Sequence, residues 1–258
     1  MMVSPSDYAE CSVLARAVGK ELLSRLDWMQ LQPHYIADMR CRTGELTQEL
    51  AVRYPKAQIL GIDNDMTMLH YAQQHVSKCI KWLLADGESI PIAGETLDFI
   101  CSHFLLPWHM RVIDVLQEWQ RLLQPGGLLL FTSFGPDTLR EWASLLSPSM
   151  HIVDMHELGD ALVQAGFVDP VLEVDHYTLT YTDPAKFLYE LQVNAFIPRD
   201  LLLSTIVMQQ YSEQAQLTAT FEVIYGHAWM PKTRGYRQDA EGVARIPLTH
   251  LRGYKGEK

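Results

Sequence analysis

Three aspartates each follow a short apolar run directly. Their spacing is typical of residues at the ends of successive strands, where side chains from different strands can bind one ligand. They are Asp38, Asp63 and Asp86, and the runs before them cover residues 35–37, 59–62 and 82–85. Carboxylates are strong hydrogen-bond acceptors, and one at the end of a second strand is suited to hold the hydroxyls of a ribose. The spacing therefore predicts three carboxylates facing one crevice, with Asp63 as the ribose ligand.

The elements that must position these aspartates alternate between strands and helices. Apolar runs predict strands over 34–39, 58–63, 81–86, 97–102 and 128–133, and helical spacing between them predicts helices from 44 to Pro55, over 66–75 and over 112–123. Such alternation is typical of a parallel sheet with right-handed crossovers. Ligands of these sheets bind beyond the carboxyl ends of the strands, which is where the aspartates are expected.

The rest of the chain departs from this alternation. Helical spacing covers 11–26 and 155–165, and alternating apolar residues predict strands over 171–181 and 218–229. We expect a helical N-terminal cap over 1–33, a main domain over 34–231 with a closing strand pair, and a helical lid inserted over 184–214. The predicted fold class is α/β, a doubly wound seven-stranded sheet that is mostly parallel and has an antiparallel last strand.

Composition narrows the class of protein. The 258 residues are 48% hydrophobic and suit one large domain, and no apolar run approaches the roughly 18 residues that span a bilayer. Four scattered cysteines favour neither a metal site nor a disulfide framework. The net charge of −10 argues against general nucleic-acid binding. These features predict a cytoplasmic protein without a membrane or nucleic-acid partner, and we expect a monomer.

Charge is distributed unevenly along the chain. The tail over 232–258 carries a net charge of +4, against −14 for the remaining residues. A solvated and partly disordered tail is the more ordinary interpretation. The alternative is a docking patch for an acidic partner.

Several motifs, taken in order, resemble one family. Segments 38–44, 61–63 and 85–91 match cofactor motifs, and segments 8–18, 122–128, 131–139, 154–162 and 224–229 extend the match over most of the chain. The cofactor motifs resemble those of class I S-adenosylmethionine-dependent methyltransferases, which have a Rossmann-like fold. Segments 134–139 and 154–160 are most similar to the malonyl-acyl-carrier-protein O-methyltransferases of biotin synthesis.

The resemblance implies a role for each matching residue. Asp38 and Gly44 would frame the methionine part of the cofactor, Asp63 would hold the ribose, Asp86 and Gly87 would lie beside the adenine, and Ser102 would begin the floor of the transfer site at 102–105. Tyr8, Trp108 and Arg199 are candidates for the substrate side, although a packing role is equally plausible for Tyr8 and better for Trp108. No metal is implied.

The implied reaction is methyl transfer from S-adenosylmethionine to the free carboxylate of malonyl-acyl-carrier protein. Two alternatives stay open: a methyltransferase for another small acid or a protein side chain, and a binding or assembly protein with weakened cofactor binding. The second rests on Arg40 and Arg42, which stand where the family has glycines. Their charge is expected to repel the sulfonium cation of the cofactor unless they pair with its carboxylate.

Overall fold

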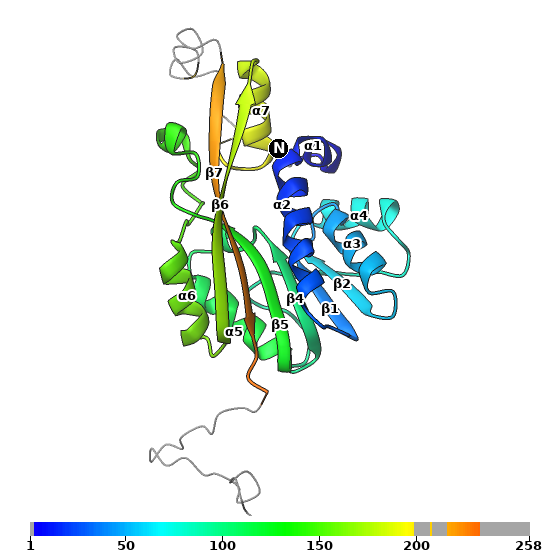
Figure 1. Ribbon diagram of the computed structural model, residues 1–258. Coiled ribbons are helices and arrows are strands. Elements are labelled where there is room, and N and C mark those ends of the chain that lie inside the picture. The colour runs from blue at the N-terminus through cyan, green and yellow to red at the C-terminus, as the bar shows by residue number, and fades with distance from the viewer. Residues whose placement is uncertain (1–2, 199–206, 208–215, 233–258) are drawn as a thin grey trace, which may run out of the picture.

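A seven-stranded sheet forms the centre of the computed structural model, which describes residues 3–198, 207 and 216–232 (Figure 1). The strand order is β3-β2-β1-β4-β5-β7-β6. The first five strands are parallel, with β1 next to both β2 and β4. Because the strand order reverses beside β1, the crevice at the carboxyl ends of β1 and β4 is the expected ligand site.

The parallel strands lie close to the positions that their apolar runs predict. They are β1 (Tyr35–Met39), β2 (Gln58–Asp63), β3 (Lys81–Leu84), β4 (Leu97–His103) and β5 (Leu123–Phe134). The largest difference is at β5, which begins five residues earlier than predicted and includes Pro125 and two glycines. A proline lacks the N–H that a sheet needs, so the sequence there indicates a turn. In the structure Leu123 pairs with Leu97 of β4, and the pairing resumes at Leu128 after an irregularity in the register.

The last two strands form a long antiparallel hairpin at one edge of the sheet. Strand β7 (Leu217–Trp229) lies between β5 and β6 (Val168–Tyr181) and is antiparallel to both. The predicted antiparallel last strand is thus confirmed. Figure 1 shows the hairpin rising past the other strands, with α7 (Pro184–Val193) beside its far end.

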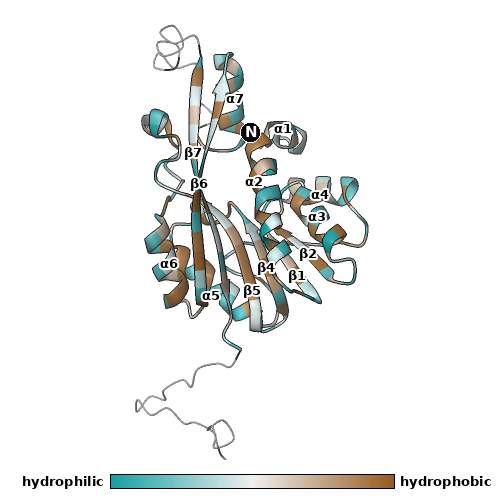
Figure 2. Cartoon of the chain, viewed as in Figure 1, coloured by the Kyte–Doolittle hydropathy of each residue, from teal (hydrophilic) through white to brown (hydrophobic). Residues whose placement is uncertain are grey.

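Helices cover both faces of the sheet. On one face, α2 (Val13–Ser24) and α3 (Glu45–Arg53) share a core with β1, β4 and β5, and α4 (Met66–His75) packs against β2 and β3. On the other face, α5 (Val112–Leu122) and α6 (Met155–Gln164) form the second core. Figure 2 shows the apolar residues gathered on the strands and on the inner sides of these helices.

The predicted N-terminal helix over 11–26 is divided in the structure. Most of it is α2, which continues into the 3₁₀ turn η1 (Arg25–Trp28). Cys11 instead ends a separate helix, α1 (Pro5–Cys11), and Ser12 lies between α1 and α2. The Ser12 hydroxyl donates to the Tyr8 carbonyl, which satisfies a carbonyl at the end of α1. The break turns α1 away from α2, so Tyr8 lies over the crevice.

The predicted lid over 184–214 is only partly described. Helix α7 ends at Val193, and the residues from Asn194 to Pro198 are not helical. Residues 199–206 and 208–215, including Arg199, lie outside the described residues, as does the predicted basic tail beyond Lys232. Among the helices described, none is long and apolar enough to cross a membrane.

The close approach of β5 and β7 requires a glycine at position 226. A Cβ atom there would lie 2.2 Å from the ring of Phe131, which is fully buried in the opposite strand. We expect Gly226→Ala to lower the free energy of unfolding by about 1–3 kcal/mol through overpacking, measured by denaturant titration. The matched control is Gly159→Ala in α6, where the nearest atom lies 3.4 Å away. That change should be stabilising, and equal effects would contradict the packing argument.

Candidate functional site

Asp38 is the next-to-last residue of β1, as in the strand predicted over 34–39. Its side chain points to the α3 face and is 1% exposed. Oδ2 accepts a hydrogen bond from the Thr47 hydroxyl at 2.5 Å, whereas Oδ1 is buried without a partner in the described part of the chain. Burial raises the pKa of Asp38 to about 7, because the Thr47 hydrogen bond offsets only part of the desolvation and Asp63 adds a like charge.

Asp63 ends β2 as predicted and is 2% exposed. One carboxylate oxygen accepts from the backbone N–H of Arg42 and the other from the N–H of Asp65, both at 2.9 Å. These bonds tie the turn after β1 to the end of β2. Each oxygen retains a lone pair, since a carboxylate offers about four acceptor positions.

Asp86 is exposed and lies two residues beyond β3, so it is separate from the buried pair Asp38 and Asp63. Its carboxylate accepts from Asn64 at 3.4 Å and from the Glu88 N–H at 3.2 Å. His109 approaches it at 4.0 Å and bonds Glu88 at 2.8 Å. The adjacent Gly87 is buried, and a Cβ there would meet the Leu105 side chain at 3.0 Å.

The turn that joins β1 to α3, residues 38–44, is called the first turn below. Arg40, Arg42 and Gly44 have φ angles of 64°, 51° and 82°, so every second residue is left-handed. A residue with a Cβ pays on the order of 1–2 kcal/mol in this region. The turn thus keeps a backbone path that glycine would adopt freely, although two of its three left-handed positions are arginines.

The two arginines of the first turn point to different aromatic rings. The Arg40 guanidinium donates to the Phe104 carbonyl at 2.8 Å and lies 5.2 Å from the centre of the Trp108 ring. The Arg42 guanidinium lies 5.1 Å from the ring of Tyr8 on α1. Desolvation and the neighbouring Arg42 lower the pKa of Arg40 to about 9.

Two polar side chains at the end of β4 lie beside the first turn. Ser102 pairs with Met39 across the strands, and its hydroxyl is buried without a partner among the described residues. His103 contacts the Thr132 hydroxyl at 2.7 Å and the Ala15 carbonyl at 2.9 Å. Burial lowers the pKa of His103 to about 4, so the imidazole is neutral at physiological pH and holds α2 against β4.

A cleft of about 710 Å³ lies between the N-terminal helices and the first turn, and we call it the cap cleft. Its walls come from α1, α2, the first turn, α3 and α4, and Asp38, Arg40 and Thr43 line it. Pockets for small molecules and cofactors commonly have this size. Asp38 lines the cap cleft, so a buried acidic group lies beside a space large enough for a ligand.

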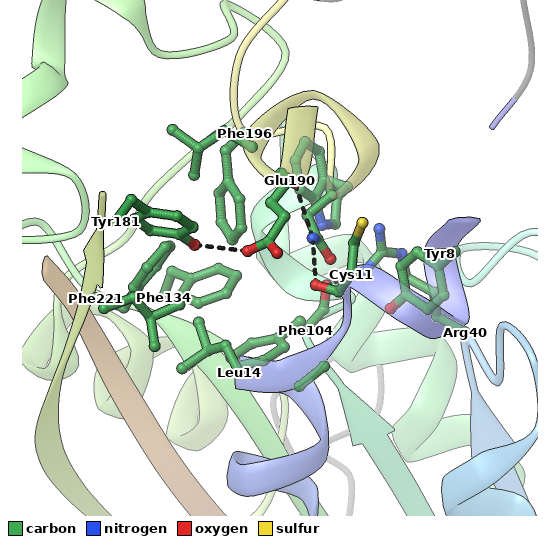
Figure 3. A pocket seen from close by; sticks show the side chains of 15 residues that line it. Tyr8, Cys11, Leu14, Arg40, Phe104, Phe134, Tyr181, Glu190, Phe196 and Phe221 are labelled. Carbon is green, nitrogen blue, oxygen red and sulfur yellow. Dashed lines mark hydrogen bonds between the residues drawn. The ribbon is translucent and has the colours of Figure 1, made fainter. Parts of the chain in front are cut away.

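A second, smaller pocket lies beyond Arg40, and we call it the aromatic pocket (Figure 3). Phe104, Phe134, Phe196 and Phe221 surround it, and about 30 Å³ is free between them. Its acidic group, Glu190 on α7, accepts from the Tyr181 hydroxyl at 2.8 Å. An acyl group would therefore enter only if the lining side chains shifted.

The aromatic pocket contains residues that the sequence did not single out. Glu190 and Tyr181 come from α7 and β6, which lie far along the chain from the first turn. Their only sequence signal is a carboxylate within the predicted lid. Of the substrate-side candidates, Tyr8 and Trp108 do line this pocket, together with Arg40.

The residues present fit the cofactor that the resemblance implies, on one direct observation. Buried polar atoms are almost always hydrogen-bonded, yet Asp38 Oδ1 and Ser102 Oγ on adjacent strands have no partner among the described residues. A ligand with an ammonium group would satisfy Asp38. Ser102 pairs with Met39 and therefore points to the opposite face of the sheet, away from Asp38. The buried Asp63 at the neighbouring strand end supplies an acceptor for hydroxyls.

Solved structures with a similar backbone show the fold. Phosphoethanolamine N-methyltransferase 2 of Haemonchus contortus, solved with S-adenosylmethionine, aligns with a TM-score of 0.57 at 16% identity, over 83% of this chain and 52% of that one. Geranyl diphosphate C-methyltransferase of Streptomyces coelicolor aligns with a TM-score of 0.53 at 12% identity, over 83% and 75%. The family model described as a methyltransferase domain matches residues 37–131, from β1 to β5. The chain thus has a methyltransferase domain with a Rossmann-like fold.

Curated relatives define the family more narrowly. A malonyl-acyl-carrier-protein O-methyltransferase of a Methylovorus species is 35% identical over 88% of this chain and 86% of its own length. The corresponding protein 1 of Coxiella burnetii is 31% identical over 95% and 90%. The chain belongs to the family of malonyl-acyl-carrier-protein O-methyltransferases, which confirms the resemblance seen in its motifs.

Proposed function

We propose that this protein transfers a methyl group from S-adenosylmethionine to the free carboxylate of malonyl-acyl-carrier protein, in the synthesis of the biotin precursor. The observation that carries the proposal is family membership, with relatives of that name matching nearly the whole chain at 30–35% identity. The sulfonium of S-adenosylmethionine supplies the methyl group when the cofactor is bound. The cap cleft and the aromatic pocket meet at Arg40, which suits a reaction between two ligands.

The acceptor chemistry places few demands on the protein. A malonyl carboxylate is already ionised at neutral pH, so no general base is required. The protein has to align the carboxylate oxygen with the methyl carbon and to exclude water. The aromatic side chains of the second pocket are suited to exclude water, and Tyr8 and Trp108 would contact the acceptor there.

The cofactor roles follow the order of the strands. Asp63 would hold the ribose hydroxyls with its free lone pairs, and the exposed Asp86 would lie near the adenine amino group beside Gly87. Asp38 would accept from the ammonium of the methionine part, which supplies a donor for its unpartnered oxygen. Gly44 would frame the methionine part with its backbone. The glycine is required there by packing, since a Cβ would meet the Trp82 side chain at 2.9 Å.

Product analysis tests the proposed reaction. We expect purified protein with malonyl-acyl-carrier protein and S-adenosylmethionine to give a product heavier by one methyl group, measured by intact-protein mass spectrometry. Acetyl-acyl-carrier protein is the control and should stay unchanged, because it lacks the free carboxylate. Methylation of small free acids but not of the malonyl carrier protein would contradict the proposed acceptor, as would failure to restore biotin-independent growth in a strain lacking this methyltransferase.

A second candidate function is favoured by the first turn. Arg40 and Arg42 occupy left-handed positions where glycine would be free of strain, and both are cationic. A relative that binds partners without the cofactor would tolerate them. Thermal unfolding with S-adenosylmethionine and S-adenosylhomocysteine separates the two functions, since only a cofactor-binding protein gains stability with either ligand.

The expectations about location and assembly stay predictions. The net charge of −10 argues against general nucleic-acid binding, whereas the cytoplasmic location, the monomer and the lack of a membrane partner are expectations only. An acidic carrier protein would need a local basic surface on this acidic chain. The candidates for that surface, Arg199 and the tail beyond Lys232, lie outside the described residues.

A further inference from the structure

The Arg40 guanidinium forms no ion pair within the part of the chain that the structure describes. It donates to the neutral Phe104 carbonyl and lies over the Trp108 ring, and no carboxylate of the described residues forms an ion pair with it. Arg40 is half-buried, and a charge that is partly removed from water is commonly paired. A guanidinium has five N–H donors arranged in a planar fork that matches a carboxylate. One donor binds Phe104, so the fork retains donors for an anion.

The Arg40 guanidinium lies where the cofactor and the methyl acceptor would meet. Arg40 lines both the cap cleft and the aromatic pocket, a property that it shares with Tyr8 and Ala15. Figure 3 shows Arg40 and Tyr8 on one side of the aromatic pocket, opposite Tyr181 and Phe221. Neither Tyr8 nor Ala15 carries a positive charge, so among the described residues Arg40 is the cation that lines both cavities.

We propose that Arg40 binds the carboxylate of a ligand at the junction of the cap cleft and the aromatic pocket. This inference rests on the proposed function, which offers two sources of that carboxylate. One is the amino-acid carboxylate of the cofactor, whose ammonium would face Asp38 in the same cleft. The other is the malonyl carboxylate that accepts the methyl group. Both present the same planar anion to the guanidinium, and binding measurements distinguish them.

Arg42 provides a matched control in the same turn. It is also a left-handed arginine, but its guanidinium lies over Tyr8 and it does not line the aromatic pocket. Arg40→Gln and Arg42→Gln therefore remove the same charge from neighbouring positions. Arg40→Lys keeps the positive charge but lacks the planar set of guanidinium donors. We therefore expect it to bind the carboxylate more tightly than Arg40→Gln and less tightly than the native protein. Denaturant titration of all variants reports on folding.

Two ligands identify a cofactor carboxylate. S-adenosylhomocysteine carries the amino-acid carboxylate, whereas 5′-methylthioadenosine lacks it. If Arg40 holds this group, calorimetry should show Arg40→Gln weakening S-adenosylhomocysteine roughly ten- to hundredfold while 5′-methylthioadenosine binds as before. If Arg40 holds the acceptor instead, the affinity for S-adenosylhomocysteine stays constant and KM for malonyl-acyl-carrier protein rises by a similar factor.

Other outcomes overturn the inference. Equal effects of Arg40→Gln and Arg42→Gln on every ligand would show a general influence of charge. Tighter S-adenosylmethionine binding by Arg40→Gln would show repulsion of the sulfonium, as the sequence predicts for an unpaired arginine. Native protein that neither binds S-adenosylhomocysteine nor methylates malonyl-acyl-carrier protein would instead refute the proposed function, and this inference with it.

Discussion

Replacing Asp63 with alanine is expected to weaken S-adenosylmethionine binding roughly ten- to hundredfold. The side chain ends β2 in a buried position and would lose a charge-assisted hydrogen bond to the ribose, which is worth about 1.5–3 kcal/mol. Isothermal calorimetry with the folded variant measures the change. Unchanged affinity would remove Asp63 from the ribose site.

The control must separate ligand binding from stability, because Asp63 also accepts from the N–H groups of Arg42 and Asp65. Asp154 is a matched residue that accepts from the N–H groups of His156 and Glu157 at the start of α6, away from the cap cleft. Asp154→Ala should reduce stability and leave cofactor affinity intact. Asp63→Asn retains a carbonyl acceptor and serves if the alanine variant does not fold.

A second large effect is expected in the pH dependence of stability, from Asp38. The folded pKa of about 7 lies above the ordinary value of 3.8, so between these values the folded protein binds a proton that the unfolded chain has lost. Stability therefore falls as pH rises through this range, by about 1.4 kcal/mol per pH unit. Asp38→Asn keeps an acceptor for Thr47 and removes the titration.

Denaturant titrations at several pH values measure this effect as a difference between two proteins. From about pH 5 to about pH 8, native protein should lose roughly 2–3 kcal/mol more than Asp38→Asn, because the folded carboxyl loses its proton near pH 7. Other titrating groups are common to both proteins and cancel. Parallel pH profiles would mean that the Asp38 carboxylate is ionised in the folded state throughout, with an ordinary pKa.

Local pattern was sufficient to predict most of the fold. Helix α4 spans Met66–His75 as its apolar spacing predicts, and Asp63 ends β2 as its apolar run predicts. Strand and helix periods are properties of neighbouring residues, so a sequence displays them directly. The family motifs are also local, which explains why the class of reaction was predictable before the fold was known.

Contacts between distant residues were decided only in the tertiary structure. Asp38 is buried and unpaired at Oδ1 because α3 covers it with Thr47, and no apolar run indicates this. Glu190 and Tyr181 line the aromatic pocket together with residues of the N-terminal helices. They lie there because of the course of the β6–β7 hairpin.

For the two arginines of the first turn, the sequence predicts one property and the tertiary structure decides another. Their residue types predict charge beside the ligand, and the sequence by itself determined that this turn departs from a glycine-rich one. The tertiary structure decided where each charge lies: Arg40 between two cavities and Arg42 against Tyr8. The physical reason is that a backbone turn sets the direction of each side chain, while the elements packed around it decide which partner the side chain meets.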